Sequence, residues 1–169
     1  MKAEDIQVRA VAREDVPAVV AHVTAVLAEY GLAFGEGSAT DADLHRLPEA
    51  YTERGGAFWV ATTPDGALVA TCGIVPLPAC DPNDAGLMEL RKMYLSSGLR
   101  GLGIGRRLLD QAVGFARRAG ASAIVLDTID GMEQAINFYE RAGFTRDDSQ
   151  IRGSRCERGY RLDLTPSPD

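Results

Sequence analysis

The chain has 169 residues, of which 46% are hydrophobic and 25% are charged, a composition close to the globular average. This length fits one domain with a core of its own, and the composition excludes a disordered or low-complexity chain. Lysine and arginine number 18 against 24 acidic residues, so the formal net charge is −6. Nucleic acids and anionic membranes require a basic surface, so neither is an expected partner. This acidic net charge is typical of a soluble enzyme and favours a cationic substrate.

Cysteine and histidine usage argues against a metal centre. The cysteines Cys72, Cys80 and Cys156 are odd in number and far apart, and no CxxC pair occurs. With only two histidines in the chain, a zinc site is hard to assemble, so we expect reduced thiols and no metal. The acidic start has no apolar run behind it, and no stretch approaches 18 apolar residues, so neither a signal peptide nor a membrane span is expected. These features predict a cytoplasmic protein.

The first part of the chain predicts a strand followed by an amphipathic helix. Residues 6–11 alternate apolar and polar side chains, which is typical of a strand. Asp15 is a candidate N-cap, and apolar side chains recur at helical spacing from Val16 to Tyr30. Gly31 ends this helix and opens a loop over residues 31–39.

A broken helix, a hairpin and an exposed connection come next. The second helix begins near Thr40, and Pro48 kinks or splits it. Residues 57–63 and 66–75 predict two strands of a hairpin, joined by the turn Thr63-Pro64-Asp65-Gly66. Residues 76–86 contain three prolines and predict an exposed connection.

The second half alternates strands with helices, so a single mixed α/β domain is predicted over residues 1–169. Its first strand covers Leu87–Leu95, and a helix over about residues 103–119 follows a glycine-rich turn. Ala123–Leu126 is an apolar run typical of a central strand buried on both faces. A further helix is predicted to start with Asp130 and Glu133, which resemble a capping box, and to end at Gly143. Two last strands are expected within residues 144–149 and 155–164, followed by a frayed tail over residues 164–169.

A glycine-rich turn stands between a predicted strand and a predicted helix, with the sequence Arg100-Gly101-Leu102-Gly103-Ile104-Gly105-Arg106. Glycines let the backbone approach an anion closely, and the first N–H groups of a helix are unsatisfied. Together with the helix dipole and the charges of Arg100 and Arg106, these groups predict a phosphate or pyrophosphate site. The alternative is a turn that merely starts a helix, because such motifs have many false positives.

The residues around these glycines argue against two common classes of phosphate ligand, nucleoside triphosphates and dinucleotides. No Gly-Lys-Ser/Thr follows them, which disfavours a nucleoside triphosphate. A dinucleotide fold is the sharper rival, because Asp127 ends the next strand 22 residues after Gly105, where a ribose-binding acid would stand. However, Leu108 replaces the third glycine, and the 42 residues after Asp127 are too few to complete a doubly wound sheet. A dinucleotide-binding protein is therefore a remote alternative.

A second motif runs from Ala135 to Phe144 with the sequence Ala-Ile-Asn-Phe-Tyr-Glu-Arg-Ala-Gly-Phe. With it the chain resembles the GCN5-related N-acetyltransferase (GNAT) family, known for an [RQ]xxGx[GA] pyrophosphate turn and an AxxFYxxxGF helix. Arg100, Gly103 and Gly105 match the first motif, and the second is matched in full. The order of elements also agrees over residues 4–164. The resemblance implies a GNAT-like acyl-CoA N-acyltransferase fold, an α/β fold in which helices flank a central mixed sheet.

Two positions depart from the family pattern. Ser96-Ser97-Gly98 replaces a turn that often contains proline. Met132 stands seven residues before Tyr139, where many members place an asparagine that touches the cofactor. Neither change removes the phosphate-binding turn.

The resemblance implies acetyl-CoA as the cosubstrate. Its pantetheine arm would pair with the backbone of Met93, Tyr94 and Leu95, and a backbone N–H of that stretch would polarise the thioester carbonyl. Its pyrophosphate would lie on the turn formed by Arg100, Gly101, Leu102, Gly103, Ile104, Gly105 and Arg106.

By the same resemblance, Tyr139 is the general acid for the departing CoA thiolate. Reference pKa values of about 10 for a phenol and about 8.5 for a thiol make that proton transfer uphill by about 2 kcal/mol. The alternative is a tyrosine that simply packs in the core, as aromatic residues at helical spacing usually do.

Glu89 is the candidate base. Charged side chains are unusual in a strand expected to be central, and a carboxylate can take the proton of an ammonium acceptor directly or through water. At period 2, Glu89, Arg91, Met93 and Leu95 share one face of the strand. The alternative is that Glu89 pairs with a nearby arginine on a solvated face.

The sequence therefore predicts an acetyl-CoA-dependent N-acetyltransferase in which a primary amine attacks the thioester directly. The acceptor is a small-molecule or peptide amine, and no nucleic acid, membrane or metal partner is expected; the resemblance also allows a homodimer. The competing class is an acyl-CoA-binding sensor without turnover. His22 and His45 are expected to be surface or packing residues, and Arg117 and Arg118 to form the exposed face of their helix.

Overall fold

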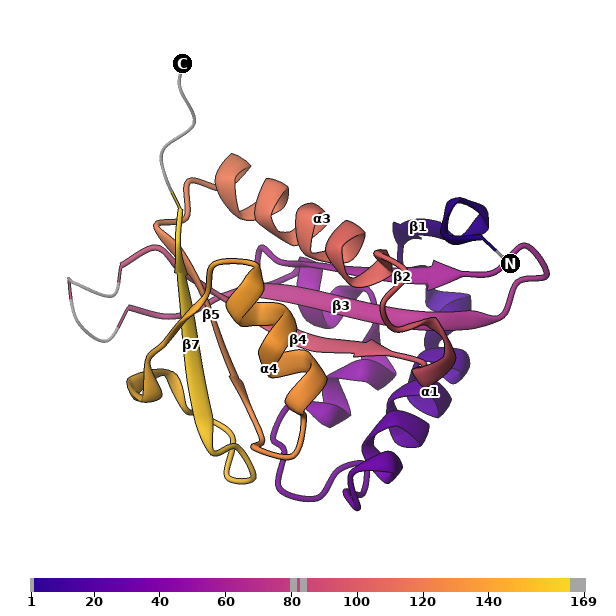
Figure 1. The fold of residues 1–169 in the computed structure, drawn as a ribbon. Coiled ribbons are helices and arrows are strands. Elements are labelled where there is room, and N and C mark those ends of the chain that lie inside the picture. Colours follow the sequence, from indigo (N-terminus) through magenta and orange to yellow (C-terminus); the bar gives the residue numbers. More distant parts are fainter. Residues whose placement is uncertain (1, 80–81, 83–84, 165–169) are drawn as a thin grey trace.

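The strands of this chain, which are separated by helices and loops, assemble into one mixed β-sheet. The computed structural model describes residues 2–79, 82 and 85–164, and in it the strand order is β1-β2-β3-β4-β5-β7-β6 (Figure 1). Neighbouring strands are antiparallel except β4 and β5, which run parallel. The strands are β1 (Gln7–Ala10), β2 (Ala57–Thr62), β3 (Leu68–Pro76), β4 (Leu87–Leu95), β5 (Ala123–Thr128), β6 (Thr145–Arg146) and β7 (Arg158–Asp163).

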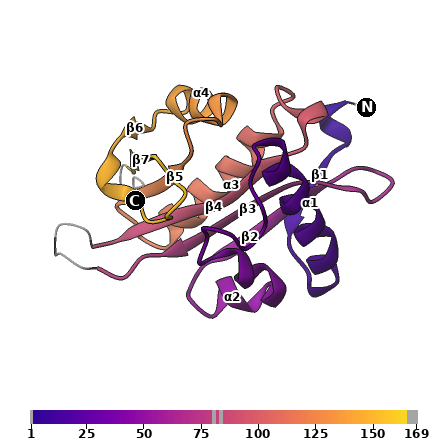
Figure 2. The same ribbon diagram turned by 90° about the horizontal axis from the view of Figure 1, so that it is seen from below.

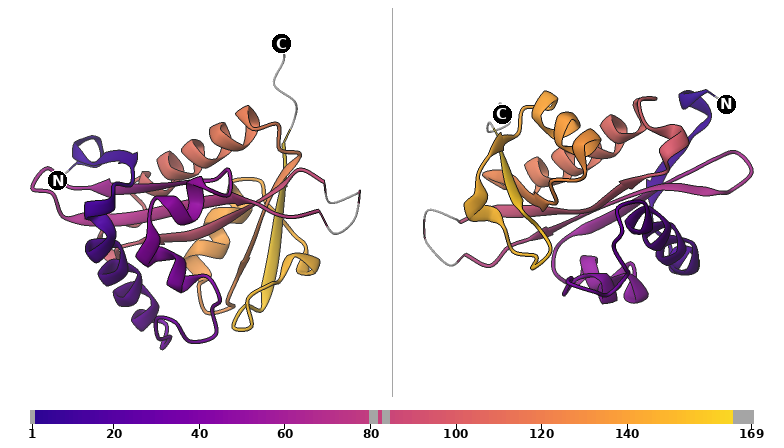
Figure 3. Two further views of the ribbon diagram at one scale, coloured as in Figure 1. Left: turned by 180° about the vertical axis from the view of Figure 1, so that it is seen from behind. Right: turned by 60° about the horizontal axis from the view of Figure 1, so that its bottom comes forward.

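Helices cover both faces of this sheet, which confirms the predicted architecture. On one face lie α1 (Val16–Glu29), the short α2 (Glu49–Thr52) and the 3-10 helix η3 (Asp41–Arg46); on the other lie α3 (Ile104–Arg118) and α4 (Glu133–Arg141) (Figures 2 and 3). The remaining 3-10 helices are η1 (Ala3–Asp5), η2 (Arg13–Asp15), η5 (Ser97–Leu99) and η6 (Asp148–Gln150).

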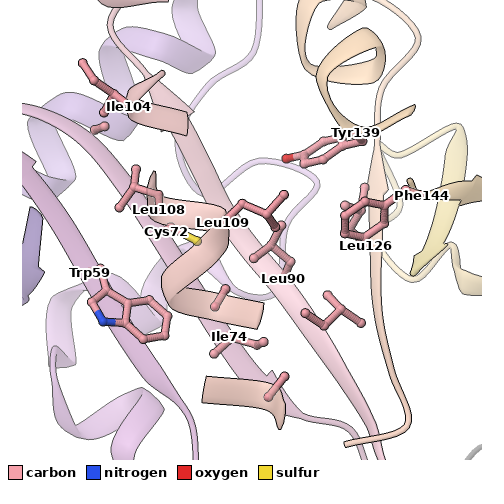
Figure 4. Close-up of a cluster of buried hydrophobic side chains, with 14 of the residues drawn as sticks. Trp59, Cys72, Ile74, Leu90, Ile104, Leu108, Leu109, Leu126, Tyr139 and Phe144 are labelled. Atoms are coloured by element: carbon pink, nitrogen blue, oxygen red, sulfur yellow. The ribbon is translucent and has the colours of Figure 1, made fainter. Parts of the chain in front are cut away.

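Apolar clusters on the two faces hold the layers together. Beneath α3, side chains such as Trp59, Ile74 and Leu108 pack against one another (Figure 4). On the opposite face, Leu27 of α1 and Tyr51 of α2 pack against the sheet. Burial of such large apolar side chains, at about 25 cal/mol per Å² of apolar surface, is the main stabilising contribution to the fold.

Most of the predicted boundaries are confirmed. Pro48 separates η3 from α2, as the sequence suggested. Gly31, Gly120 and Gly143 adopt positive φ just after α1, α3 and α4, respectively. Cys80, part of the 76–86 connection and residues 165–169 lie outside the described residues.

At neither of two predicted helix caps does the side chain bond to the helix, because each carboxylate is paired with an arginine. Asp15 occupies the N-cap position of α1, as predicted, but its side chain makes no cap bond. Its carboxylate accepts hydrogen bonds from both terminal nitrogens of Arg9, at 2.7 and 2.8 Å, and from the backbone N–H of Ala12 at 2.7 Å. Asp130 forms an ion pair with Arg158, and the residue that precedes α4 is Met132, which makes no side-chain cap.

A β-bulge interrupts β4 at Lys92. Its φ is 55°, a left-handed value unusual for a residue other than glycine, and the register with β3 shifts between Thr71 and Gly73. Glu89 and Arg91 therefore lie on the η3 side of the sheet, where Arg91 is 3.8 Å from Asp43.

Met93 and Leu95, in contrast, pack with the cluster beneath α3. The prediction that Glu89, Arg91, Met93 and Leu95 share one face is thus wrong. The physical reason is that the extra residue at the bulge reverses the alternation of side chains.

β4 and β5 pair only at their beginnings. Their register covers Leu87, Met88 and Glu89 against Ala123–Val125, although both strands continue beyond these pairs. Figure 1 shows the two strands spreading apart, with α4 beside the widening gap. The part of β4 after Glu89 therefore lacks a neighbouring strand on that side, within the described residues.

Asp41 is the centre of a buried charge cluster that joins four segments. Its carboxylate pairs with Lys92 on β4 and accepts hydrogen bonds from the backbone N–H of Gly35 at 2.7 Å and from Ser38 Oγ at 3.0 Å. Both terminal nitrogens of Arg155 also donate to it, at 3.4 Å. Burial alone would raise the pKa of Asp41, but the bonds from Lys92 and Gly35 and the charges of Lys92 and Arg155 hold it below its ordinary value.

Replacing Asp41 by Asn should lower the free energy of unfolding by about 3–5 kcal/mol, because the charges of Lys92 and Arg155 then remain buried without a counter-charge. Urea unfolding at neutral pH measures this loss. The matched control is Asp110→Asn, which removes an exposed pair with Arg106 and should cost less than about 1 kcal/mol. Equal losses for the two variants would contradict a central role for Asp41.

Candidate functional site

The glycine-rich turn connects β4 to α3 in the place that the sequence predicted. Gly101 and Gly103 have φ values of 83° and 80°, a left-handed region that other residues rarely adopt. A Cβ atom on either glycine would meet nothing within 4 Å, so the turn is open rather than packed. Gly103 precedes α3 and no side chain caps that helix, which leaves N–H groups of the first turn free for an anion.

The two arginines of the turn have different surroundings. Arg100 donates to Glu29 Oε2 at 2.7 Å and to the backbone oxygen of Leu95 at 3.1 Å, so it ties the turn to α1. Arg106 is exposed and pairs with Asp110 one helical turn away. Arg106 is therefore the more exposed charge beside the turn, while Arg100 also holds the turn against α1.

A pocket of about 550 Å³ lies between this turn, the end of β4 and α4. Leu102 and Ile104 do not line it: Leu102 is exposed on the outside of the turn, and the Ile104 side chain is buried in the core. Most of the predicted site does line it, namely Met93, Tyr94, Leu95, Arg100, Gly101, Gly103, Gly105, Arg106 and Tyr139.

Other residues of the lining were not among the predicted site residues. The pocket is lined by Val26 of α1, by Tyr30 just after that helix, and by Gln134, Asn137 and Arg141 of α4. The helical periodicity identified their elements, but only the packing of α1 and α4 against β4 brings these side chains to one place.

A second pocket, of about 460 Å³, lies beside the first. Its walls are residues 37–40, residues 89–94 of β4, residues 126–129 at the end of β5 and residues 152–156 before β7. The residues that line both pockets are Met93, Tyr94, Met132, Ala135 and Tyr139. The pockets therefore meet at the gap between β4 and β5.

Tyr139 stands at this junction. Its ring makes edge-on contacts with Phe138 and Phe144, each with centroids 5.5 Å apart. Figure 4 shows the hydroxyl on the side of the ring away from Phe144. Burial raises the pKa of Tyr139, so the phenol keeps its proton at neutral pH.

Glu89 lines the second pocket and is buried. Arg91 Nε donates to its Oε1, while Oε2 is 3.8 Å from Arg152 Nε, which is longer than a hydrogen bond. The alternative that Glu89 pairs with an arginine is thus observed, although on a buried face rather than a solvated one. Oε2 is the oxygen that remains for an acceptor.

His22 connects α1 to the same strand, and His45 lies apart from it. His22 Nε2 is 3.0 Å from the backbone oxygen of Tyr94, so in a neutral ring Nε2–H donates this bond. Burial lowers the pKa of His22, against the smaller opposing influence of that bond. His45 contacts the ring of Phe34 edge-on at 5.7 Å. Both are packing residues, as expected, and Arg117 and Arg118 are exposed, as predicted.

The dinucleotide alternative does not fit this structure. Asp127 Oδ2 accepts the backbone N–H groups of Arg152 and Gly153, each at 2.7 Å, so this acid shapes a loop. The sheet is mostly antiparallel, which contradicts a doubly wound parallel fold.

Two further features bear on the class of protein. Among residues 2–79, 82 and 85–164, none of the helices has the length and apolar character to cross a membrane. In the same ranges, no three or more His, Cys, Asp or Glu side chains gather in a way that could hold a metal ion.

Comparison with known proteins agrees with this geometry. The model of the acetyltransferase (GNAT) family matches residues 23–144. The uncharacterized N-acetyltransferase YjgM of Escherichia coli (strain K12) is 34% identical over 136 residues, which cover 80% of this chain and 79% of that protein. The chain spans less than half the length of several vertebrate N-acetyltransferases that it also matches.

Solved structures share the fold. A GNAT-family acetyltransferase from Staphylococcus aureus Mu50 superposes with a TM-score of 0.84 at 24% identity, covering 95% of this chain and 99% of that one. A putative acetyltransferase from Salmonella typhimurium, solved with its cofactor acetyl-CoA, has a TM-score of 0.74 at 16% identity and coverages of 98% and 97%. The chain belongs to the acetyltransferase (GNAT) family, which confirms the predicted family, fold and acyltransferase class.

Replacing His22 by Gln should flatten the pH dependence of stability between about pH 5 and pH 7. Since the folded pKa of His22 lies below the unfolded value of about 6.5, the unfolded state binds more protons in this range. The stability of the wild-type chain is therefore lost as the pH falls below about 6.5. Urea unfolding at several pH values measures the slope, and an unchanged slope in the variant would contradict this assignment.

Proposed function

We propose that this chain is an acetyl-CoA-dependent N-acetyltransferase that transfers an acetyl group to a primary amine by direct attack. The observation that carries the proposal is that a cofactor-sized pocket and a second pocket meet at Tyr139. The acceptor is a small-molecule or peptide amine, and we place the reaction in the cytoplasm.

The first pocket fits acetyl-CoA in its shape and its polar groups. The open turn at Gly101 and Gly103 and the free N–H groups at the start of α3 suit a pyrophosphate, with Leu102 and Ile104 contributing backbone N–H groups. The unpaired edge of β4 from Met93 to Leu95 suits an arm that adds to the sheet as an extra strand. The volume of about 550 Å³ lies in the range of ligand pockets.

Two side chains of the chain handle protons in this proposal. When bound, acetyl-CoA supplies the thioester that the amine attacks. Glu89 Oε2 takes the proton of the acceptor ammonium, directly or through water. Tyr139 donates its proton to the departing sulfur. Because burial makes ionisation of this phenol costlier, we expect its proton to move as the C–S bond breaks rather than before.

A second candidate is an acyl-CoA-binding sensor without turnover. The ion pair between Glu89 and Arg91 favours it, since one carboxylate oxygen is already occupied. The replacement of the usual asparagine by Met132, which lines both pockets, also favours it. Turnover with any amine separates the enzyme from the sensor.

Acetyl-CoA and CoA should raise the thermal stability of the chain, whereas NAD and ATP should not. A ligand at a hundred times its dissociation constant adds about 2.7 kcal/mol to the free energy of unfolding. Leu102→Glu places a negative charge on the turn and should weaken acetyl-CoA binding about tenfold relative to Leu102→Gln, a difference of about 1.4 kcal/mol. Stabilisation by NAD alone, or equal affinities of the two variants for acetyl-CoA, would contradict the assignment of the glycine-rich turn as the pyrophosphate site.

Replacing Tyr139 by Phe should lower kcat by about a hundredfold or more while leaving the affinity for acetyl-CoA nearly unchanged. Phenylalanine keeps the contacts with Phe138 and Phe144, so only the proton donor is lost. The matched control is Tyr51→Phe, because the Tyr51 hydroxyl is buried without a hydrogen-bond partner and lies outside both pockets. If thiol release from acetyl-CoA is as fast in Tyr139→Phe as in Tyr51→Phe, Tyr139 is not the acid.

A further inference from the structure

The lining of the second pocket differs in its balance of charges from the chain as a whole. Although the formal net charge is −6, the charged side chains that line this pocket are mostly cationic. The cations are Arg91, Lys92, Arg152 and Arg155, against the anions Glu89 and Asp127. Local charges of this kind, rather than the net charge, decide which groups a pocket binds.

The anions of the pocket wall have their own partners. Asp127 Oδ2 is occupied by two backbone N–H groups of the loop that follows η6. Glu89 Oε1 is occupied by Arg91 Nε. Behind the wall, the single negative charge of Asp41 faces two positive charges, Lys92 and Arg155. Asp43 in addition lies 3.8 Å from Arg91, so the acids around the pocket equal its four cations in number. An anionic ligand would therefore be drawn by the most exposed of these cations rather than by a net charge.

Arg152 is the cation best placed to meet a ligand. Its side chain is 38% exposed, against 4% for Lys92 and 13% for Arg155. Its terminal nitrogens donate one hydrogen bond each to Gln150, at 2.8 and 3.0 Å, which fixes the guanidinium while leaving further N–H donors. Its Nε lies 3.8 Å from Glu89 Oε2, so a carboxylate acceptor and a guanidinium donor stand side by side in the pocket.

A paired carboxylate and guanidinium match a ligand that carries an ammonium and a carboxylate close together. With its ammonium at Glu89 Oε2, an α-amino acid has its carboxylate only one carbon further on, within reach of Arg152. A guanidinium binds carboxylates with directed, charge-assisted hydrogen bonds. An amine without an anionic group would leave the remaining N–H donors of Arg152 without a partner in the ligand.

The walls of the pocket suit a small molecule. Ser154 Oγ donates to the backbone oxygen of Gly37 at 3.1 Å, and Arg155 donates to that of Glu36 at 2.9 Å. These bonds join the loop before η3 to the loop before β7 across the outside of the pocket. Leu32 and Ile129 add apolar surface to its walls, which a side chain of the ligand would contact.

We propose that the acceptor of this enzyme is a small amine that carries a carboxylate next to its amino group, such as an α-amino acid or a derivative of one, held by Arg152. This inference rests on the proposed function. During the transfer one ammonium proton passes to Glu89, and the N–C bond forms as the C–S bond breaks and the sulfur receives the proton of Tyr139. The second proton that the nitrogen loses returns to the Tyr139 phenolate, Glu89 releases its proton to water, and the carboxylate at Arg152 is unchanged.

The test compares matched acceptors with the purified full chain and acetyl-CoA. Each proteinogenic L-amino acid is assayed beside its primary amide and its decarboxylated amine, with O-phosphoethanolamine as an amine bearing a different anion. Thiol release and product mass are the readouts. For the best amino acid, kcat/KM should exceed that of its own amide and amine by about tenfold or more, the value of one charge-assisted hydrogen bond.

Arg152→Gln should reduce this preference for the amino acid over its amide about tenfold, through KM for the amino acid. Arg146→Gln, at an exposed position of β6 outside both pockets, is the matched control and should keep the preference. A parallel loss of activity with amino acid and amide in Arg152→Gln would indicate a merely structural role and overturn the assignment of Arg152.

The outcomes separate this inference from the proposed function. Equal or better transfer to the amides, the decarboxylated amines or O-phosphoethanolamine overturns the inference and leaves the N-acetyltransferase standing. Thermal stabilisation by acetyl-CoA without transfer to any amino acid also overturns it. If acetyl-CoA neither stabilises the chain nor is consumed with any amine, the proposed function fails as well.

Discussion

The buried pair between Asp41 and Lys92 constrains the strand on which both pockets are built. Lys92 occupies a left-handed backbone position in the middle of β4, and its side chain is held by Asp41 while Thr71 Oγ1 donates to its carbonyl oxygen at 2.7 Å. The bulge reverses the alternation of side chains, so Glu89 and Arg91 belong to the second pocket while Leu95 packs beneath α3. A regular strand would have sent Glu89 and Leu95 to the same face. One strand can therefore serve two pockets because a single residue is added to it.

The parallel pairing of β4 with β5 explains why these pockets meet. A parallel pair that continued to the end of both strands would close the sheet, but here pairing stops at Glu89. The open edge receives no strand from the described residues; instead α4 lies beside it (Figure 1). Its residue Tyr139 lines both pockets. The same opening supplies an unpaired backbone edge on one side and a passage to the second pocket on the other. Exposed strand edges are normally avoided, so an opening of this kind in the middle of a sheet is expected where a ligand completes the pairing.

Electrostatics in this protein are organised locally. The sum of all charges is negative, yet Arg91, Arg152 and Arg155 line the second pocket, and Arg100 and Arg106 line the first. Ion pairs with acids set the position of several of these cations: Glu29 holds Arg100 against α1, and Asp41 holds Arg155 behind the pocket wall. The net charge of a protein influences its association with large charged partners. Binding of a ligand in a pocket of a few hundred Å³ depends instead on the charged side chains within a few ångströms of it. The zwitterionic acceptor that we propose is therefore argued from these local side chains and not from the composition.

The sequence by itself determined the order of the elements and both motifs, because these depend on local periodicity, on glycines that alone adopt left-handed turns, and on residue types at fixed spacing. Residues 100–106 and 135–144 are enough to mark the turn at the start of α3 and the helix that bears Tyr139. The tertiary structure alone decided the face of each side chain in β4, because the side chain at the bulge, Lys92, is paired with Asp41, 51 residues earlier in the chain. It also decided that residues 37–40 and 152–156 enclose one pocket, and that Arg152 stands beside Glu89. These contacts join segments that are far apart in the sequence. A local sequence pattern cannot predict them, because they form only when the elements pack together.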